Sequence, residues 1–302
     1  MPHGTVTRRA YAKLNLALAV GPPEGEASAR PGWHRIASWS CAIGLADELR
    51  ARRLPDGAAS TWSFACTPDA PRRFAFDWPP TADLTYRAHA LLQHETRRPL
   101  PTAFTLSKRI PPQGGLGGGS SDAAAALLAL NELFELRLSA ERLRDLSTRI
   151  GSDVAFFIDE TDPPRPALVT GFADRVERTT PAPCGVVLIV PPFGSATPQA
   201  YKAFDSLRPG PLREREVREM ARTGRPARAA LFNDLREAAF TLHPALRTLR
   251  DRAERATSRP VHLTGSGSTL FVLCETSEMN TIAERAARAL PDASIVATEC
   301  VG

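Results

Sequence analysis

Apolar and polar residues in the first half of the chain follow two spacings. Period-two spacing with β-branched and aromatic residues is typical of strands, and it marks Thr5–Val20, Ile36–Leu49, Trp62–Phe76 and Thr102–Ile110. Apolar residues that recur every three or four positions are typical of helices, and they mark Leu84–His94, Ala123–Phe134 and Ala140–Arg149, the last with Ser139 as its N-cap. The first half therefore mixes strands with helices, and it contains no apparent repeat.

The second half continues this mixture. The patterns predict strands at Ala167–Val176, Gly185–Val190 and Ala293–Thr298, and a strand–turn–strand at His262–Leu273 with glycines at its bend. They predict helices at Leu235–Leu249, broken or kinked at Pro244, and at Met279–Leu290. Together the elements indicate an α+β fold whose two regions divide near residue 160.

Two segments lack such periodicity. Gly21–Gly32 is rich in Pro, Gly, Glu and Ala, which predicts a loop. Pro209–Arg228 is heavily charged, so we expect a solvated helix or connector. An RNA-binding arm is the alternative, but no aromatic residues lie between its charges, as stacking on bases would require.

Composition narrows the class of protein. The chain has 302 residues, of which 43% are hydrophobic and 24% charged, as in ordinary globular proteins, and no apolar stretch is long enough to span a bilayer. A signal peptide is disfavoured because Lys13 and Asn15 interrupt the apolar residues near the N-terminus. The five cysteines have neither metal-ligand nor redox spacing, so we expect free thiols in a reducing cytoplasm.

Charge adds one clue. The net charge of +5 permits binding to anions, including nucleic acid, although a nucleotide substrate needs only a local positive site. Nearly all the basic residues are arginine, and lysine occurs only at positions 13, 108 and 202. Each lysine is therefore informative, because a compact ammonium and a planar guanidinium are not interchangeable at a reacting centre.

The most informative segment is RIPPQGGLGGGSSDAAAALLALN, residues 109–131. Glycines allow close backbone approach, and the N-terminus of the helix that follows offers N–H groups and a positive dipole end to phosphate. A flexible linker is disfavoured because an apolar helical face begins at once after the loop. No Lys follows the glycines as in the P-loop, and the spacing fits the dinucleotide fingerprint poorly.

The loop resembles the phosphate-binding motif of the GHMP kinases, Pro-x-x-x-Gly-Leu-Gly-Gly-Gly-Ser-Ser, from Pro111 to Ser121. This resemblance implies a two-domain fold: an ATP-binding domain like ribosomal S5 domain 2 at residues 1–160, and a ferredoxin-like domain at 161–302. The substrate cleft would lie between them. It also implies ATP and Mg²⁺ as cofactors, with Ser120, Ser121 or Asp122 near the metal. The implied ATP contacts are Asp83, Leu84, Lys108, Gly115, Leu116, Gly117, Gly118, Gly119, Ser120 and Ser121.

Two further motifs imply the catalytic pair. Tyr11-Ala12-Lys13-Leu14-Asn15-Leu16 resembles the family's opening motif, and Lys13 and Asn15 share one face of a strand because they have the same parity. Gly151-Ser152-Asp153-Val154 resembles the segment that carries the family's catalytic carboxylate; the alternative for Asp153 is a helix cap. By resemblance, Asp153 accepts the substrate's hydroxyl proton, Lys13 offsets charge on the phosphoryl group, and Asn15 contacts the substrate.

The implied substrate-binding residues point to one group within the superfamily. Gly32-Trp33-His34 aligns with a cytosine-binding Gly-Tyr-His, Thr264-Gly265 belongs to a turn that closes over the site, and Phe193 is a candidate second aromatic beside the base. With GLGGGSSD, these motifs are most similar to the members that phosphorylate the 2-hydroxyl of a cytidine-diphosphate-linked methylerythritol for isoprenoid synthesis.

Three alternatives to this substrate stay open. They are a GHMP kinase for homoserine, mevalonate or a sugar, a non-catalytic ATP-binding protein, and an RNA-binding protein of the same fold. For the kinase we expect a small-molecule substrate, no nucleic acid or membrane partner, and a monomer or homodimer.

Overall fold

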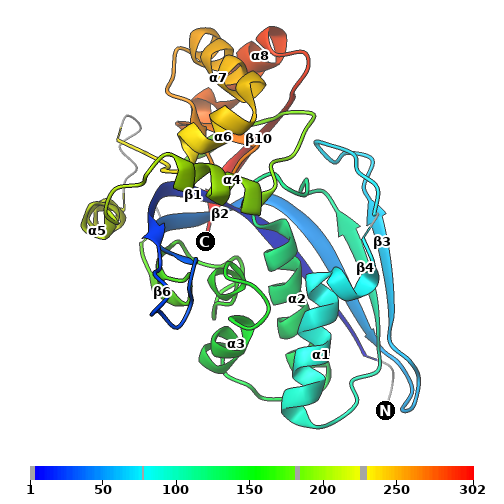
Figure 1. The fold of residues 1–302 in the computed structure, drawn as a ribbon. Coiled ribbons are helices and arrows are strands. Elements are labelled where there is room, and N and C mark those ends of the chain that lie inside the picture. The colour runs from blue at the N-terminus through cyan, green and yellow to red at the C-terminus, as the bar shows by residue number, and fades with distance from the viewer. Residues whose placement is uncertain (1–3, 77, 181–183, 225–229) are drawn as a thin grey trace.

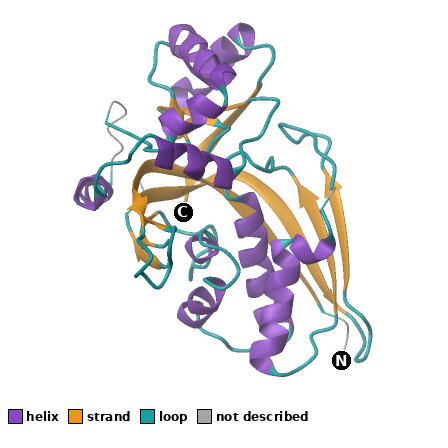
Figure 2. Ribbon diagram, in the orientation of Figure 1, coloured by secondary structure: helices purple, strands orange, loops and turns teal. Residues whose placement is uncertain are grey.

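The computed structural model describes residues 4–76, 78–180, 184–224 and 230–302. Two long antiparallel strands, β1 (Thr5–Pro23) and β2 (His34–Arg53), run through its middle (Figures 1 and 2). One edge of β2 pairs with β1. The other edge pairs in succession with β5 (Ala167–Gly171), β10 (Ser294–Val301) and β4 (Thr102–Lys108). β2 therefore organises the sheet and links the two ends of the chain.

The remaining strands extend the same sheet, which has ten strands in the described residues. β3 (Thr61–Cys66) lies parallel to β4, and β6 (Arg175–Arg178) pairs with β5. On the far side of β10 follow β7 (Gly185–Val190), β9 (Leu270–Cys274) and β8 (His262–Leu263). β5 lies beyond residue 160 yet pairs with β2, and it carries β6 with it, so the domain boundary near 160 stays a prediction.

Helices gather at two ends of the sheet (Figure 2). α1 (Leu84–Thr96), α2 (Gly118–Leu133) and α3 (Ala140–Ser147) form one core with β1, β2 and β4, to which α2 contributes a run of alanines. α6 (Arg236–Leu242), α7 (Pro244–Thr257) and α8 (Met279–Ala289) form a second core with β7 and β9. α4 (Thr197–Ser206) lies at the junction of the two groups, and short 3₁₀ turns cover Pro80–Ala82, Val154–Phe157 and Thr276–Glu278.

Most predicted elements are confirmed. The prediction of an α+β fold is confirmed, Gly185–Val190 is a strand with the expected bounds, and Ser139 caps α3 by accepting from the Arg142 N–H. Pro244 separates α6 from α7, as expected. Trp62–Phe76 contains a strand, as predicted, and this strand is β3, which ends at Cys66. Some bounds differ: α2 begins at Gly118, within the glycines, and the strand predicted at Ala167–Val176 is interrupted, because β5 ends at Gly171 and β6 begins at Arg175. The patterns also did not predict α4, which begins with Thr197-Pro198.

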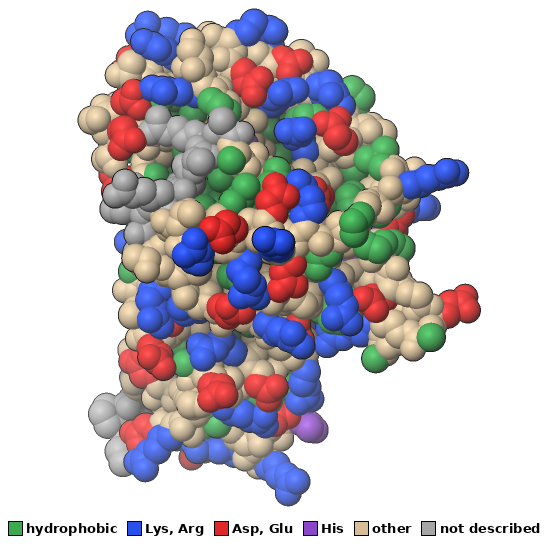
Figure 3. Space-filling view, turned by 90° about the vertical axis from the view of Figure 1, so that its left-hand side faces the viewer, with side chains coloured by type: hydrophobic (Ala, Val, Ile, Leu, Met, Phe, Trp, Pro, Cys, Tyr) green, Lys and Arg blue, Asp and Glu red, His purple; other side chains and the backbone are tan. Residues whose placement is uncertain are grey.

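The charged segment contains α5 (Glu214–Thr223), which forms ion pairs such as Arg218–Glu177 and Arg222–Glu219; residues 225–229 of this segment lie outside the described residues. On the face that includes α5, acidic and basic side chains are interspersed (Figure 3). α5 therefore agrees with the expected solvated helix. In the described ranges, no helix combines the length and apolarity needed to cross a bilayer.

Candidate active site

The glycine loop joins β4 to α2 and presents the start of that helix. Gly115 and Gly117 have φ angles of 73° and 70°, in the left-handed region that favours glycine. Gly117 is the N-cap of α2, and no side chain caps the helix. The first N–H groups of α2 are therefore left for a ligand, as the sequence predicts, and such a helix end favours an anion.

Both halves of the chain hold this loop. The Lys13 N–H donates to the Leu116 carbonyl at 2.9 Å, so β1 supports the loop from below. The Thr264 hydroxyl donates to the Gly115 carbonyl at 3.2 Å and accepts from the Asn15 N–H at 3.1 Å. Gly265 packs so closely on the loop that an added Cβ would lie 2.9 Å from the Gly115 oxygen. These contacts leave the loop little freedom to move.

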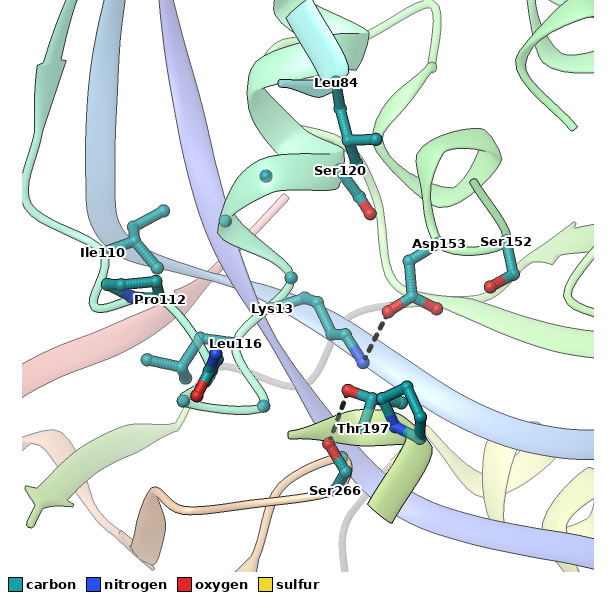
Figure 4. A pocket seen from close by; sticks show the side chains of 18 of the residues that line it. Lys13, Leu84, Ile110, Pro112, Leu116, Ser120, Ser152, Asp153, Thr197 and Ser266 are labelled. Atoms are coloured by element: carbon teal, nitrogen blue, oxygen red, sulfur yellow. Dashed lines mark hydrogen bonds and ion pairs between the residues drawn. The ribbon is translucent and has the colours of Figure 1, made fainter. Parts of the chain in front are cut away.

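Lys13 and Asp153 meet beside the loop, although 140 positions separate them in the sequence. The Lys13 Nζ lies 3.3 Å from Asp153 Oδ2 (Figure 4) and donates to Asn15 Oδ1 at 2.6 Å, so Lys13 and Asn15 share a face as predicted. The Lys13 side chain is 7% exposed and that of Asp153 is 39% exposed. Asp153 makes no helix-capping hydrogen bond. Its carboxylate is therefore within reach of a ligand, while the ammonium is enclosed.

These residues border a cleft of about 920 Å³. Residues from both halves of the chain line it, as Figure 4 shows for Ser120, Thr197 and Ser266. Most of the predicted site residues are among those that line it: Lys13, Asn15, Trp33, His34, Asp83, Leu84, Lys108, Gly115, Leu116, Gly117, Gly118, Gly119, Ser120, Asp122, Asp153 and Gly265. The described lining does not include Ser121, Thr264 or Phe193. Ser121 is buried and borders a separate cavity of about 170 Å³.

Phe193, the predicted second aromatic, does not belong to the described lining of the cleft. Phe193 packs against His243, with ring centroids 5.3 Å apart, and joins the C-terminal core. Tyr201 of α4 lines the cleft instead, and its ring lies 5.0 Å from that of His34. Burial, and to a smaller extent the charge of Asp153, raises the pKa of Tyr201, so the phenol stays neutral. Its place on an unpredicted helix explains why the patterns did not identify it.

His34 is oriented by two oxygens. Its Nδ1 lies 2.9 Å from the Gly21 carbonyl and its Nε2 lies 3.4 Å from Asp205 Oδ1. The Trp33 ring beside it is 53% exposed and stands at the mouth of the cleft. Trp33, His34 and Tyr201 therefore offer flat surfaces and polar edges to a ring-shaped ligand.

Lys108, a predicted ATP contact, lies in a buried charge cluster. Its ammonium donates to the carboxylates of Asp47 and Asp122, and all three side chains are at most 7% exposed. Burial alone would lower the pKa of Lys108, but the two carboxylates raise it above its usual value. Asp47 also accepts from the N–H groups of Arg109 and Ile110, at 2.5 and 2.8 Å. The cluster therefore fixes the entry of the glycine loop.

An aromatic wall beside this cluster was also not predicted as part of the site. Phe64, Phe74, Phe76 and Trp78 line the cleft and contact one another, with Phe64 and Phe76 stacked at 5.5 Å. Asp83 caps α1 by accepting from the Thr85 N–H and also accepts from Trp78 Nε1 at 3.2 Å. The period-two aromatics at 74, 76 and 78 were the available signal, but they suggested only a strand.

Metal ligands are sparse. Within the described ranges, no three His, Cys, Asp or Glu side chains gather in a way that could hold a metal ion. Asp122 lines the cleft, and its Oδ1 is buried without a hydrogen-bond partner among the described residues. A hard cation such as Mg²⁺ takes oxygen ligands and commonly shares them with phosphates. The Asp122 oxygen and the Ser120 hydroxyl fit such a shared site.

Comparison with known proteins gives the family. Residues 83–160 match the model of the GHMP kinase N-terminal domain, and residues 213–292 match that of the C-terminal domain. A relative from Bacillus velezensis, named 4-diphosphocytidyl-2-C-methyl-D-erythritol kinase, is 31% identical over 89% of this chain and 88% of its own. A relative of the same name from Pelotomaculum thermopropionicum is 33% identical over 94% of this chain and 93% of its own.

A solved structure agrees with these matches. The crystal structure of a 4-(cytidine 5'-diphospho)-2C-methyl-D-erythritol kinase is 30% identical, with a TM-score of 0.74 over 98% of this chain and 100% of that one. The N- and C-terminal domains of the GHMP kinase fold, expected from the glycine loop, are thus both matched in this chain. The chain belongs to the GHMP kinase family, in the group whose relatives carry the name 4-diphosphocytidyl-2-C-methyl-D-erythritol kinase.

Proposed function

We propose that this ATP-dependent kinase transfers the γ-phosphoryl group of ATP to the 2-hydroxyl of 4-diphosphocytidyl-2-C-methyl-D-erythritol, in the non-mevalonate route to isoprenoid precursors. The observation that carries the proposal is the Lys13–Asp153 pair, 3.3 Å apart, in the same cleft as an uncapped helix N-terminus and the Trp33–His34–Tyr201 group. Relatives of the same length that bear this name support the choice of substrate.

The glycine loop would hold the triphosphate. N–H groups at the start of α2 face the cleft without a side-chain cap, and they suit phosphate oxygens. Mg²⁺, when bound, would offset the charge of the phosphates, with Ser120 and Asp122 as its protein oxygens. The adenine would lie against the aromatic wall of Phe64, Phe74, Phe76 and Trp78, because purine rings stack well on aromatic surfaces.

The Lys13–Asp153 pair would activate the acceptor. The exposed part of the Asp153 carboxylate would accept the proton of the substrate hydroxyl as its oxygen bonds to phosphorus. Lys13, fixed by Asn15, would place a positive charge beside the transferring phosphoryl group. Because Lys13 is enclosed and hydrogen-bonded, little reorganisation would be needed during transfer.

The base-binding group would select the substrate. A cytosine ring could lie between the exposed Trp33 and Tyr201, with its polar edge toward His34. Homoserine and mevalonate contain no aromatic ring that could lie there. The Trp33–His34–Tyr201 group therefore favours the cytidine-linked substrate over those alternatives. The interspersed charges around α5 (Figure 3) provide no support for an RNA-binding surface on that face.

The test is ADP release from ATP and Mg²⁺ with the diphosphocytidyl substrate, beside mevalonate and homoserine. We expect turnover with the first alone, and ³¹P NMR of the product should show a new phosphomonoester. Turnover with mevalonate or homoserine instead would refute the proposed substrate. Salt-sensitive RNA binding without ATP turnover would favour the RNA-binding alternative.

A further inference from the structure

The loop between β1 and β2 places an arginine, Arg30, beside Trp33, which lines the cleft. The Arg30 guanidinium carbon lies 5.2 Å from the centre of the Trp33 ring and 4.8 Å from that of Phe172, which fits cation–π contact with both. The Trp33 and Phe172 rings meet edge to face, with centroids 6.2 Å apart. Arg30 is thereby held beside the ring proposed to stack on the base.

Backbone hydrogen bonds shape this loop. The Glu24 N–H donates to the Trp33 carbonyl at 2.8 Å, the Gly32 N–H donates to the Glu24 carbonyl at 2.9 Å, and the Trp33 N–H donates to the Arg30 carbonyl at 3.2 Å. Gly32 has a φ of 74°, which lets the chain turn back there. These bonds set Arg30 and Trp33 on one turn, so the two side chains are placed together by the backbone.

No ion pair among the described residues neutralises the charge of Arg30, although the carboxylate-bearing Asp174 borders the same side cavity. Within the described part of the chain, Arg30 forms no ion pair, whereas Arg35 contacts the same Phe172 ring at 5.4 Å and is paired with Glu24 at 2.7 Å. An unpaired guanidinium on an aromatic surface is available to an anion, and its planar donors suit phosphate oxygens. Arg30 and Arg35 therefore contact the same aromatic ring, but Arg35 is ion-paired and Arg30 is not, within the described residues.

Arg30 and the residues that precede Asp153 border one side cavity of about 130 Å³. Arg30, Trp33 and Phe172 line it on one side, and Gly151 and Ser152, which precede the proposed base Asp153, also border it. Trp33, Phe172 and Ser152 line the main cleft as well, so these residues border both spaces. The cavity therefore extends from the proposed base-binding ring to the residues beside the proposed base.

We propose that Arg30 is a specificity-determining residue that binds the diphosphate joining the cytidine to the acceptor alcohol. This inference rests on the proposed function, because in that substrate the diphosphate lies between the base and the hydroxyl to be phosphorylated. Arg30 borders the side cavity; among the described cations that line the main cleft itself, Lys13 is occupied by Asn15 and Asp153, and Lys108 by Asp47 and Asp122. Lys202 of α4 is the competing candidate.

The experiment compares cytidine with cytidine 5'-diphosphate as inhibitors competing with the diphosphocytidyl substrate at saturating ATP. The variants are Arg30→Gln and Arg30→Lys, with Arg35→Gln and Lys202→Gln beside them. In the wild type, the diphosphate should bind more tightly than cytidine. Arg30→Gln should weaken diphosphate binding about tenfold, or about 1.4 kcal/mol, and leave cytidine binding within about twofold, because the charge acts on phosphate alone. Arg30→Lys should restore part of the loss, and Arg35→Gln should have no effect.

Several outcomes would overturn the inference. They are an unchanged diphosphate affinity in Arg30→Gln, an equal loss for cytidine and its diphosphate, an equal loss in Arg35→Gln, or a loss confined to Lys202→Gln. In each of these cases the proposed function stands. If neither compound inhibits the wild-type kinase and the diphosphocytidyl substrate is not turned over, the proposed function fails and this inference fails with it.

Discussion

Replacing Gly115 by alanine should disrupt the contact between the glycine loop and the C-terminal turn. Gly115 has a φ of 73°, and a Cβ added there would lie 2.1 Å from the Thr264 carbonyl oxygen and 3.1 Å from both Gly267 N and O. The neighbours are backbone atoms, which cannot rotate away. The Thr264 carbonyl would have to retreat by more than an ångström to reach the 3.4 Å of ordinary contact.

The loss of folding free energy in Gly115→Ala can be worked out from these contacts. A left-handed conformation costs an L-residue about 1–2 kcal/mol. The retreat would break the Thr264 hydroxyl bond to Gly115 and the Gly267 N–H bond to Thr264, which are 3.2 and 3.0 Å long. Each loss costs about 1 kcal/mol. Together these give about 3–4 kcal/mol, which corresponds to a fall in Tm of about 5–6 °C for a chain of this size.

Gly119→Ala is the matched control. It lies in the first turn of α2, and the nearest heavy atom to an added Cβ is Leu84 Cδ1 at 3.7 Å. Alanine there should leave Tm unchanged or raise it, since alanine is favoured over glycine in a helix by up to about 1 kcal/mol. Thermal unfolding of both variants gives the comparison. If Gly115→Ala melts within 1 °C of the wild type, on the order of the error of such scans, the close approach described here is wrong.

Three other predictions concern activity and pH. Asp153→Asn should lower kcat by at least about a hundredfold while ATP affinity measured by calorimetry stays unchanged; normal turnover would refute its role as base. Trp33→Ala should raise KM for the cytidine substrate, whereas a lowered kcat at unchanged KM would contradict stacking. For Asp159, burial alone would raise the pKa, but hydrogen bonds from Arg165 and the charge of Arg178 hold the pKa well below its usual value. The ionised Asp159 carboxylate therefore stabilises the fold at neutral pH, and this contribution is lost as pH falls below about 4. Asp159→Asn should make the free energy of unfolding less dependent on pH in that range. An unchanged pH dependence in the variant would contradict this role of Asp159.

The sequence was informative about the fold wherever periodicity was strong. It located β7, α1 and the break at Pro244 because these elements follow apolar spacing and proline chemistry. It could not show that α2 begins within the glycines. Glycine has a low helix propensity, and only tertiary contacts, which the sequence does not display, can outweigh that propensity. It also could not show that β2 has four partners, since strand pairing depends on contacts far apart in the chain.

The site was predicted through motifs, and residues outside the motifs were missed. Lys13 and Asp153 were identified and do meet. Phe193 was predicted as the second aromatic, whereas Tyr201, on the unpredicted helix α4, lines the cleft. Asp47 gave no signal either, because a single acid in a strand pattern reads as a surface residue until its buried partner Lys108 is known. Asn233 accepts from the Leu235 N–H and donates to the carbonyls of Leu263 and Gly265, contacts that only coordinates can show.

The pairing of β10 with β2 has a consequence for biosynthesis. Cys300 and Val301 of β10 pair with Ile43 and Ala42 of β2. This part of the β2 edge therefore stays unpaired during synthesis until the ribosome has added more than 250 further residues. Until then that edge offers unpaired N–H and C=O groups to any neighbouring nascent chain. Such distant pairings form slowly, since a large loop must close first. A chaperone that binds unfolded nascent chains should therefore raise the yield of folded protein. The increase should be smaller for a variant in which the β10 segment is moved to precede β1, because its pairing partner for β2 is then made first.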